Sequence, residues 1–439
     1  MATAKEFFNA LDKAKPIDYS NPLERKWYVE NLHGDNEAVG KLAWEINFRE
    51  GQGVYLFTGQ IGSGKSTELL RLKDKLENDG CSVFYSDLGQ WLNPELPIEL
   101  GSFLLAVVTS WVEQASGFPP TRSAAERFWD FLTKTNLTFD SLKLDAKTPL
   151  ASATLQMAMT QDASVIQQIE KTFQANKTNF VAQVHKFIEE LVAEFPEGRK
   201  IVLLIDSLEK FHADKKVSET TINSVLALFQ NTHALKLPLV HVVYSISYFV
   251  YEQNRQLPAQ FGNAIAVNLP SVHIFKQNST ELDGEVVGRM LELVEKRFPA
   301  WADFFTKAQI KHAISNSAGD LRDFIRVLQV AIISQQTAGP GRISDAAMEA
   351  AFNQIRPSLA IDSQHVTWMV RLDTSHLAEL DGALGIDFKV INRYLTTKHV
   401  LAYLNGTTWY ALHPLIRDEV LAMHTRIGSR TTPAAKAAP

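Results

Sequence analysis

The 439-residue sequence contains a single cysteine, Cys81, and no long uninterrupted apolar run. One cysteine excludes an intramolecular disulfide and is typical of a reducing compartment, so we expect a cytoplasmic protein. The longest apolar stretch, residues 237–251, is interrupted by His241, Ser245 and Ser247 and therefore predicts no membrane span. The N-terminus also lacks the charged and then apolar pattern of a signal peptide.

Excess positive charge is missing too. The 44 Lys and Arg residues are outnumbered by 49 Asp and Glu residues, which gives a formal net charge of −5. The chain therefore has no global attraction to nucleic acid or to an anionic membrane. We find no internal repeats. A hydrophobic content of 45% and this length are typical of a globular protein with two or three domains.

The most informative stretch of the sequence is a glycine-rich loop between a strand and a helix. Residues 54–57 form a short apolar run of strand formers, and residues 68–76 carry leucines at helical spacing before the stop at Gly80. Between them, residues 59–66 match the spacing G-x-x-x-x-G-K-[ST] of a phosphate-binding loop.

The chemistry of phosphate binding explains this spacing. Glycines let successive backbone N–H groups converge on one anion, and the following helix directs its free N–H groups and its dipole at the same anion. Lys65 can reach the β- and γ-phosphates, and the Ser66 hydroxyl can bind Mg²⁺. We therefore predict that ATP or ADP contacts Gly59, Gln60, Ile61, Gly62, Ser63, Gly64, Lys65, Ser66 and Thr67.

The remaining strand patterns predict an α/β fold with a five-stranded parallel sheet. A run such as 200–205, apolar from Ile201 to Ile205, is typical of a strand buried on both faces. Alternating strands and helices favour right-handed crossovers and a parallel sheet. The expected strands are residues 54–57, 82–86, 200–205, 238–244 and 264–267.

The C-terminal third changes to helical periodicity and then to a hairpin. Asn405-Gly406 is a strong turn signal between two strand-like runs, and three helices with such a hairpin form a winged-helix pattern. We expect a helical lead-in (1–50), an ATPase core (51–275) with a helical insertion (about 101–195), a helical lid domain (276–360), a winged-helix domain (361–425) and a disordered tail (426–439).

An aspartate, Asp206, ends the apolar strand 200–205. At the carboxyl edge of a parallel sheet such a residue can hold Mg²⁺ through water beside a phosphate loop, although many strands end in an aspartate that only caps a helix. Hydrolysis also needs a group that orients or deprotonates water. Ser207 cannot act as a base, so Glu209 is the nearest candidate, the alternative being a solvated residue in a helix turn. We therefore expect ATPase activity that is low or stimulated by a partner.

Three further residues are candidates for sensing or completing the nucleotide site. Ser245 follows the fourth strand and could sense the γ-phosphate, unless it is an ordinary turn serine. Arg255 is a candidate arginine finger acting in trans, or else a surface arginine. Arg322 lies in the first turn of a helix after the glycine-hinged segment 317–320 and could reach the phosphates, or pair locally with an acidic neighbour.

The phosphate loop, the box at 206–209 and the segment Gly319-Asp320-Leu321-Arg322 together resemble the AAA+ and STAND branch of P-loop ATPases over about residues 25–425. STAND proteins are nucleotide switches with an ATPase core, a helical lid and a winged helix, and many bind ADP through a winged-helix histidine. The resemblance implies that His413, just after the hairpin, touches the β-phosphate; a surface histidine is the alternative. Ser207 departs from the STAND pattern, and Arg322 departs toward origin-recognition-type proteins.

These observations favour a nucleotide-dependent switch that controls homo-oligomer assembly or a partner effector, plausible in a bacterial antiphage or stress system. A DNA-binding initiator or transposition regulator that uses the winged helix is the second interpretation. Its support in the sequence is one local basic cluster, Arg393, Lys398 and His399. A small-molecule kinase built on the same loop is the third, and it leaves the lid and the winged helix without a role.

Overall fold

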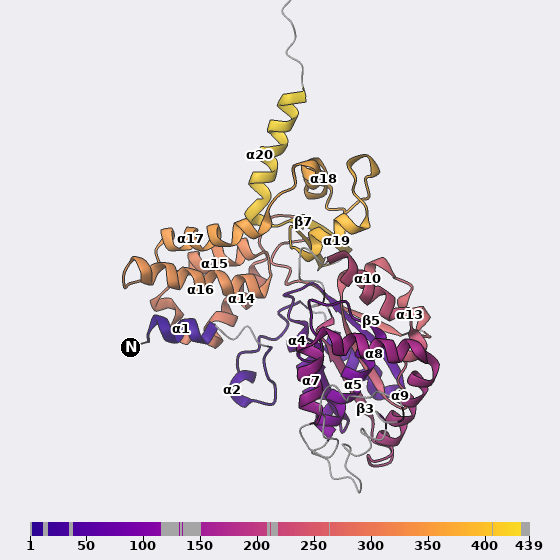
Figure 1. Ribbon diagram of the computed structural model, residues 1–439. Coiled ribbons are helices and arrows are strands. Elements are labelled where there is room, and N and C mark those ends of the chain that lie inside the picture. The colour runs from indigo at the N-terminus through magenta and orange to yellow at the C-terminus, as the bar shows by residue number, and fades with distance from the viewer. Residues whose placement is uncertain are drawn as a thin grey trace, which may run out of the picture. The chain divides into compact units, whose positions relative to one another are not determined.

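The computed structural model describes residues 2–11, 16–34, 38–115, 131, 134, 151–208, 211, 218–262, 264–405 and 407–431. The chain divides into two units. One unit, here the core unit, contains residues 37–58 and 65–268. The other, here the lid unit, contains residues 1–36, 59–64 and 269–439. Each is described by itself, with the element labels of Figure 1.

The core unit is built on a five-stranded sheet in the order β2-β3-β4-β1-β5. Pairing of β2 with β3 and of β3 with β4 is parallel. The predicted α/β fold with a five-stranded parallel sheet is confirmed, and each strand lies within three residues of its expected position. The strands are β1 (Gly53–Gly59), β2 (Ser82–Asp87), β3 (Ile201–Asp206), β4 (His241–Ser247) and β5 (Ile265–Leu269).

Strand β3 shows why the apolar runs pack as they do. All six of its residues are buried, as expected for a strand covered on both faces. Ile201, Leu203 and Ile205 join one large apolar cluster that also contains most of α5 (Leu100–Ala115), because alternate side chains of a strand share a face. The residues between them face the other side of the sheet, where α4 (Lys65–Asn78) packs on β2 and β3.

Helices cover both faces of this sheet (Figure 1). The helical insertion is seen as α5 and three following helices, but residues 116–150 lie outside the described part of the chain except for 131 and 134. The remaining helices of the core unit are α3 (Ala38–Phe48), α7 (Ala151–Gln161), α8 (Ala163–Ala175), α9 (Lys177–Val192), α10 (Ser218–Phe229), α11 (Thr232–Leu235), α12 (Tyr248–Gln253) and α13 (Leu257–Gln260), with a 3₁₀ turn at Leu88–Gln90.

The lid unit contains a helical bundle. The first helix of the chain packs in it, because Phe7 stacks on Phe298 at a ring-centroid distance of 4.5 Å and meets Phe304 and Phe305. Its helices are α1 (Ala4–Leu11), α2 (Pro22–Arg25), α14 (Gly284–Arg297), α15 (Lys307–Ser317), α16 (Leu321–Ala338) and α17 (Asp345–Ile355), with 3₁₀ turns at Pro299–Asp303 and Arg356–Leu359.

A winged-helix arrangement follows in the same unit. Strands β6 and β7 pair antiparallel with Asn405 opposite Thr407, so the hairpin turns where the sequence predicted it, although Gly406 itself lies outside the described residues. The last helix continues to Thr431, beyond residue 426 where we expected the tail to begin, because each added residue of a formed helix gains a backbone hydrogen bond. The elements are 3₁₀ turns at Ser363–His365 and Gly382–Leu384, α18 (Val366–Ser375), α19 (Phe388–Thr396), β6 (Val400–Asn405), β7 (Thr407–Leu412) and α20 (Pro414–Thr431).

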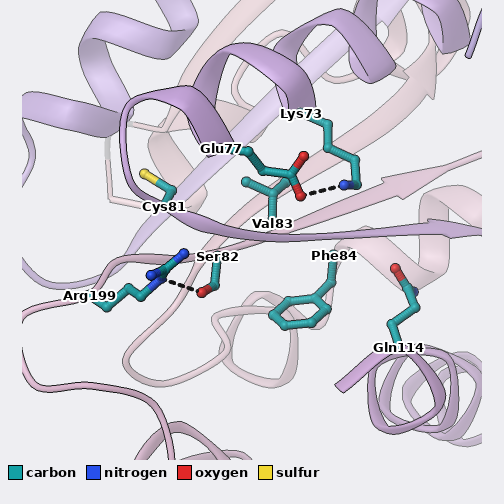
Figure 2. A pocket seen from close by; sticks show the side chains of 8 residues that line it. All are labelled: Lys73, Glu77, Cys81, Ser82, Val83, Phe84, Gln114 and Arg199. Carbon is teal, nitrogen blue, oxygen red and sulfur yellow. Dashed lines mark hydrogen bonds and ion pairs between the residues drawn. The ribbon is translucent and has the colours of Figure 1, made fainter. Parts of the chain in front are cut away.

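The outer edge of the sheet, at β2, borders a pocket of about 320 Å³ (Figure 2). Arg199 donates a hydrogen bond to the Ser82 hydroxyl at 2.7 Å there, and Lys73 pairs with Glu77. Further along β2, the Gln114 side chain accepts the Tyr85 N–H, which protects this edge against pairing with another strand. None of the pocket's lining residues belongs to the predicted nucleotide site. Across the described residues, a search for a helix long and apolar enough to cross a membrane found none.

Candidate nucleotide-binding site

The glycine-rich stretch forms a loop between β1 and α4, as its sequence predicts. Gly62 and Gly64 have φ angles of +89° and +91°, a conformation that L-residues with a Cβ rarely adopt. The Ser63 N–H donates to the Gln60 carbonyl at 3.2 Å and closes the turn. The helix then begins at Lys65, so its first N–H groups have no partner within the helix and can bind an anion.

Lys65 occupies the first position of α4 and is only 3% exposed. Three residues later, Glu68 is also buried and pairs with Arg71 at 2.8 Å. A buried lysine at a helix start is held in place before any ligand arrives, which lowers the entropic cost of binding phosphate.

The predicted magnesium residues lie around one tyrosine. The Tyr85 hydroxyl, from β2, donates to Asp206 Oδ2 at 2.6 Å, and the Ser66 hydroxyl hydrogen-bonds the same tyrosine. Burial, followed by the negative charge of Asp206, raises the pKa of Tyr85, so the tyrosine remains a neutral donor. Asp206 is fully buried, and its Oδ1 accepts the Ser207 N–H at 2.7 Å.

These residues fit a magnesium ion. A serine hydroxyl and a carboxylate are hard oxygen ligands, and Tyr85 holds Ser66 and Asp206 on its two sides. Over the described part of the chain no group of three or more His, Cys, Asp or Glu side chains could hold a metal. Nucleotide phosphates and water would therefore supply the remaining ligands, as is usual for Mg²⁺.

Two serines beside this cluster are buried, and neither hydroxyl finds a partner among the described residues. Ser207 has a φ of +72°, which is uncommon for a residue other than glycine, asparagine or aspartate. Ser245 lies in β4, one residue after Tyr244, which pairs with Ile205. Ser245 is therefore level with Asp206 on the neighbouring strand. A buried hydroxyl without a partner carries a free-energy cost that a bound polar group can relieve.

The structure describes two of the three remaining predicted catalytic residues. Glu209 lies outside the described residues. Arg255 is largely exposed and pairs with Glu252 on the preceding helix. Arg322 is the second residue of α16, and its side chain is exposed.

Within the lid unit, other residues surround the loop 59–64. The Ser271 hydroxyl donates to Gln60 Oε1 at 2.6 Å. His33 Nε2 lies 3.7 Å from the place where a Cβ on Gly64 would stand, and its Nδ1 lies 3.0 Å from the Pro270 carbonyl.

His413, which follows β7, is 1% exposed and is therefore not a surface histidine. Its Nδ1 accepts the Leu415 N–H at 3.3 Å, so the proton of the neutral ring is on Nε2. Nε2 is buried and has no partner in the described structure. Burial lowers the pKa of His413 to about 3, against a smaller opposing effect of the Asp320 charge. His413 is therefore a neutral donor that lacks an acceptor.

Comparison with known proteins adds remote similarities. No protein-family model matches the chain, and no curated protein matches it. Among solved structures, the Aeropyrum pernix ORC2 protein in ADPNP and ADP complexes is 12% identical, with 92% of this chain and 98% of that chain covered and a TM-score of 0.40. A Walker-type ATPase of Pyrococcus abyssi is also 12% identical, with 94% of this chain and 99% of that chain covered and a TM-score of 0.43. Drosophila ORC bound to DNA is 12% identical, with 96% of this chain and 91% of that chain covered and a TM-score of 0.39. Similarity at this level assigns no function to this chain.

Reasoning from the sequence missed two polar contacts of this site. Tyr85 was part of an expected strand, and nothing in its neighbourhood indicates that its hydroxyl meets a residue 121 positions later. Asp320 was considered only as a partner for Arg322, whereas its carboxylate lies against Gly62. Both contacts join residues far apart in the sequence, so no local spacing could indicate them.

Proposed function

We propose that this protein is an ATP-binding switch that hydrolyses ATP slowly and controls assembly or the activity of a partner. The observation that carries the proposal is the grouping of Ser66 and Asp206 around Tyr85, one residue after the buried Lys65. A phosphate loop alone indicates anion binding. The buried carboxylate of Asp206, linked to Ser66 through Tyr85, adds the site for Mg²⁺ that a nucleoside triphosphate requires.

Each residue then has a defined role in the proposed site. The N–H groups of residues 60–66 bind the phosphates, and Lys65 neutralises the β- and γ-phosphates. Bound Mg²⁺ would neutralise phosphate charge, held by Ser66 and by Asp206 through water. Ser245 offers a hydroxyl level with Asp206, and His413 offers its unpartnered N–H to a phosphate oxygen.

Slow turnover is expected because the residue after Asp206 is a serine, Ser207. Ser207 cannot deprotonate water, and its hydroxyl is buried. Glu209 remains our proposal for the base, and Arg255 and Arg322 remain proposals for groups that a neighbouring subunit or the lid would bring to the γ-phosphate. Both arginines are exposed, as a residue that acts after assembly or movement needs to be.

The DNA-binding alternative depends on the basic cluster of the winged helix, and that cluster is largely engaged. Lys398 is only 16% exposed and pairs with two carboxylates. His399 is buried and lies 2.9 Å from the Ala360 carbonyl. Arg393 stacks on Tyr394 and lies near Asp362. These contacts favour a winged helix that acts within the protein, and salt-dependent binding to duplex DNA would support the alternative instead.

A role in bacterial antiphage defence rests on the resemblance to STAND proteins. If it is correct, expression of the wild-type gene reduces phage plating and a Lys65→Ala variant does not. Equal protection by both genes would separate the protective activity from nucleotide binding.

The central test is nucleotide affinity measured with a fluorescent ATP analogue and Mg²⁺. Lys65→Ala removes a charged contact worth about 1.5–3 kcal/mol, so we expect affinity to fall by about 10- to 150-fold. Lys75→Ala, near the other end of the same helix, is the control and should bind as the wild type does. Equal affinity of the two variants would refute the proposed site.

A further inference from the structure

The turn before α16 is fixed by close contacts in the lid unit. Ala318 and Gly319 have φ angles of +53° and +83°. A Cβ on Gly319 would lie 1.7 Å from the Val272 carbonyl oxygen, so only glycine fits. Asp320 follows directly, and its Oδ1 accepts the Asp323 N–H at 2.8 Å as the N-cap of the helix. The turn therefore places the Asp320 carboxylate with little freedom.

That carboxylate touches the phosphate loop. The position of a Cβ on Gly62 lies 2.2 Å from Asp320 Oδ2 and 2.8 Å from its Cγ. Asp320 is only 3% exposed, so water screens its charge poorly. A buried negative charge thus lies against the loop that the proposed function assigns to phosphate.

One lysine of the winged helix balances this charge. Lys398, between α19 and β6, lies 2.7 Å from Asp320 Oδ2 and 2.9 Å from Asp323 Oδ2. Burial alone would lower its pKa, but the charges of Asp320 and Asp323 outweigh that effect and raise it. The lysine is therefore charged, and two carboxylates with one ammonium leave one net negative charge beside Gly62.

Other winged-helix groups meet the same turn. The Tyr403 hydroxyl, on β6, donates to the Ala318 carbonyl at 2.8 Å. His413 feels the charges of both Asp320 and Lys398 and has a buried N–H with no acceptor. The winged helix thus contacts the turn that carries Asp320 through Tyr403 and Lys398.

We propose that Lys398 is a positioning residue for the nucleotide: by neutralising Asp320 against Gly62, it makes phosphate binding depend on the docked winged helix. This inference rests on the proposed function, and it gives the winged helix its role in the switch. Asp320 cannot move away easily, because it caps α16 and follows Gly319, whose backbone lies against the Val272 carbonyl. Incoming phosphate therefore increases the need for the cation, so nucleotide binding and winged-helix docking should stabilise each other.

The charge of the cluster predicts opposite effects for two variants. Lys398→Asn keeps a residue that tolerates the positive φ of this position (+62°) but makes the cluster more negative. We expect about tenfold weaker binding of the ATP analogue, with a smaller loss for ADP because ADP carries less charge. Asp323→Asn removes one carboxylate instead, and we expect tighter binding of ATP. Lys398→Arg keeps the positive charge and should therefore retain most of the wild-type affinity for ATP.

The experiment measures affinity for the ATP and ADP analogues in the full chain, together with hydrogen exchange of residues 400–412. Lys389→Asn, on the same domain, is the control for surface charge. In the wild type we expect nucleotide to slow exchange of the hairpin, and in Lys398→Asn we expect this effect to be lost. A gain of affinity in Asp323→Asn cannot come from misfolding, so it supports the proposal even if Lys398→Asn is unstable.

Three results would overturn the inference: unchanged ATP affinity in both Lys398→Asn and Asp323→Asn, an equal loss for ATP and ADP in Lys398→Asn, or faster exchange of the hairpin on nucleotide binding. The proposed function fails differently. If the wild type binds no nucleotide, or if Lys65→Ala binds as well as the wild type does, the phosphate site itself is wrong.

Discussion

Replacing Gly62 by alanine tests whether the Asp320 carboxylate lies against the phosphate loop. The change adds one methyl group at a residue whose φ is +89°, and that methyl would stand 2.2 Å from Asp320 Oδ2. No carbon and oxygen can remain that close. Either the loop or the Asp320 carboxylate has to move, and Asp320 is held by its helix cap and by Lys398.

The expected magnitude has two parts. Placing an L-residue in a left-handed conformation costs roughly 1–2 kcal/mol. Displacing Asp320 loses an N-cap, which costs about 0.5–2 kcal/mol. We therefore expect Gly62→Ala to lower the free energy of unfolding of the lid unit by about 1.5–4 kcal/mol. We also expect it to weaken nucleotide binding, because the loop N–H groups lose their alignment.

Urea denaturation and nucleotide titration measure the two effects, and glycines in open space provide the controls. Gly80 has a φ of +91° and Gly385, in the lid unit, a φ of +69°, and a Cβ at either would meet nothing within 4 Å. Alanine at these positions should cost only the backbone part. In an Asp320→Ala background, Gly62→Ala should also cost only that part. If Gly62→Ala is no more harmful than Gly80→Ala, the contact with Asp320 is wrong.

Two further predictions concern the buried acid and the buried histidine. Asp206→Ala should retain nucleotide binding but lose the effect of Mg²⁺ on turnover. Titration of the ATPase rate with magnesium measures this effect. A rate that responds to Mg²⁺ as in the wild type would show that Asp206 is not part of the metal site. The pKa of His413, about 3 in the folded chain against an ordinary 6.5, gives stability that is complete above pH 6.5 and falls as the pH drops toward 3. At pH 5 the loss of unfolding free energy amounts to about 2 kcal/mol. Denaturation curves of His413→Gln should therefore show a smaller loss of unfolding free energy between pH 7 and pH 5 than the wild type does. An equal loss in both proteins would contradict the burial of this ring.

The sequence predicts those parts of the molecule that depend on short-range pattern. Strand β3 could be found because the five consecutive apolar residues 201–205 suit a strand covered on both faces. The loop before Lys65 could be found because its glycines are needed for positive φ at fixed spacing. In both cases the residues that cause the structure are neighbours in the chain.

The rest of the site depends on residues brought together by tertiary packing. Tyr85 reaches Asp206 because β2 and β3 are adjacent in the sheet and Asp87 is in register with Asp206, and strand order is not written in a strand's own pattern. Lys398 counted toward a basic cluster in the sequence, but the structure shows its ammonium paired with Asp320, the N-cap of α16, and with Asp323 in its first turn. A lysine in a polar stretch gives no local sign of whether it faces water or a buried acid.

The polar groups around the loop favour a protein that holds its nucleotide over one that turns it over rapidly. Asp206 is enclosed, with both oxygens accepting protein donors, and the residue after it is a serine that cannot act as a base. A second acid, Asp320, lies at the loop and pairs with Lys398 of the winged helix. A fast hydrolase would gain nothing if its phosphate binding depended on a lysine of the winged helix. In a switch, that dependence lets the nucleotide set the position of the winged helix, because the coupling free energy acts equally in both directions.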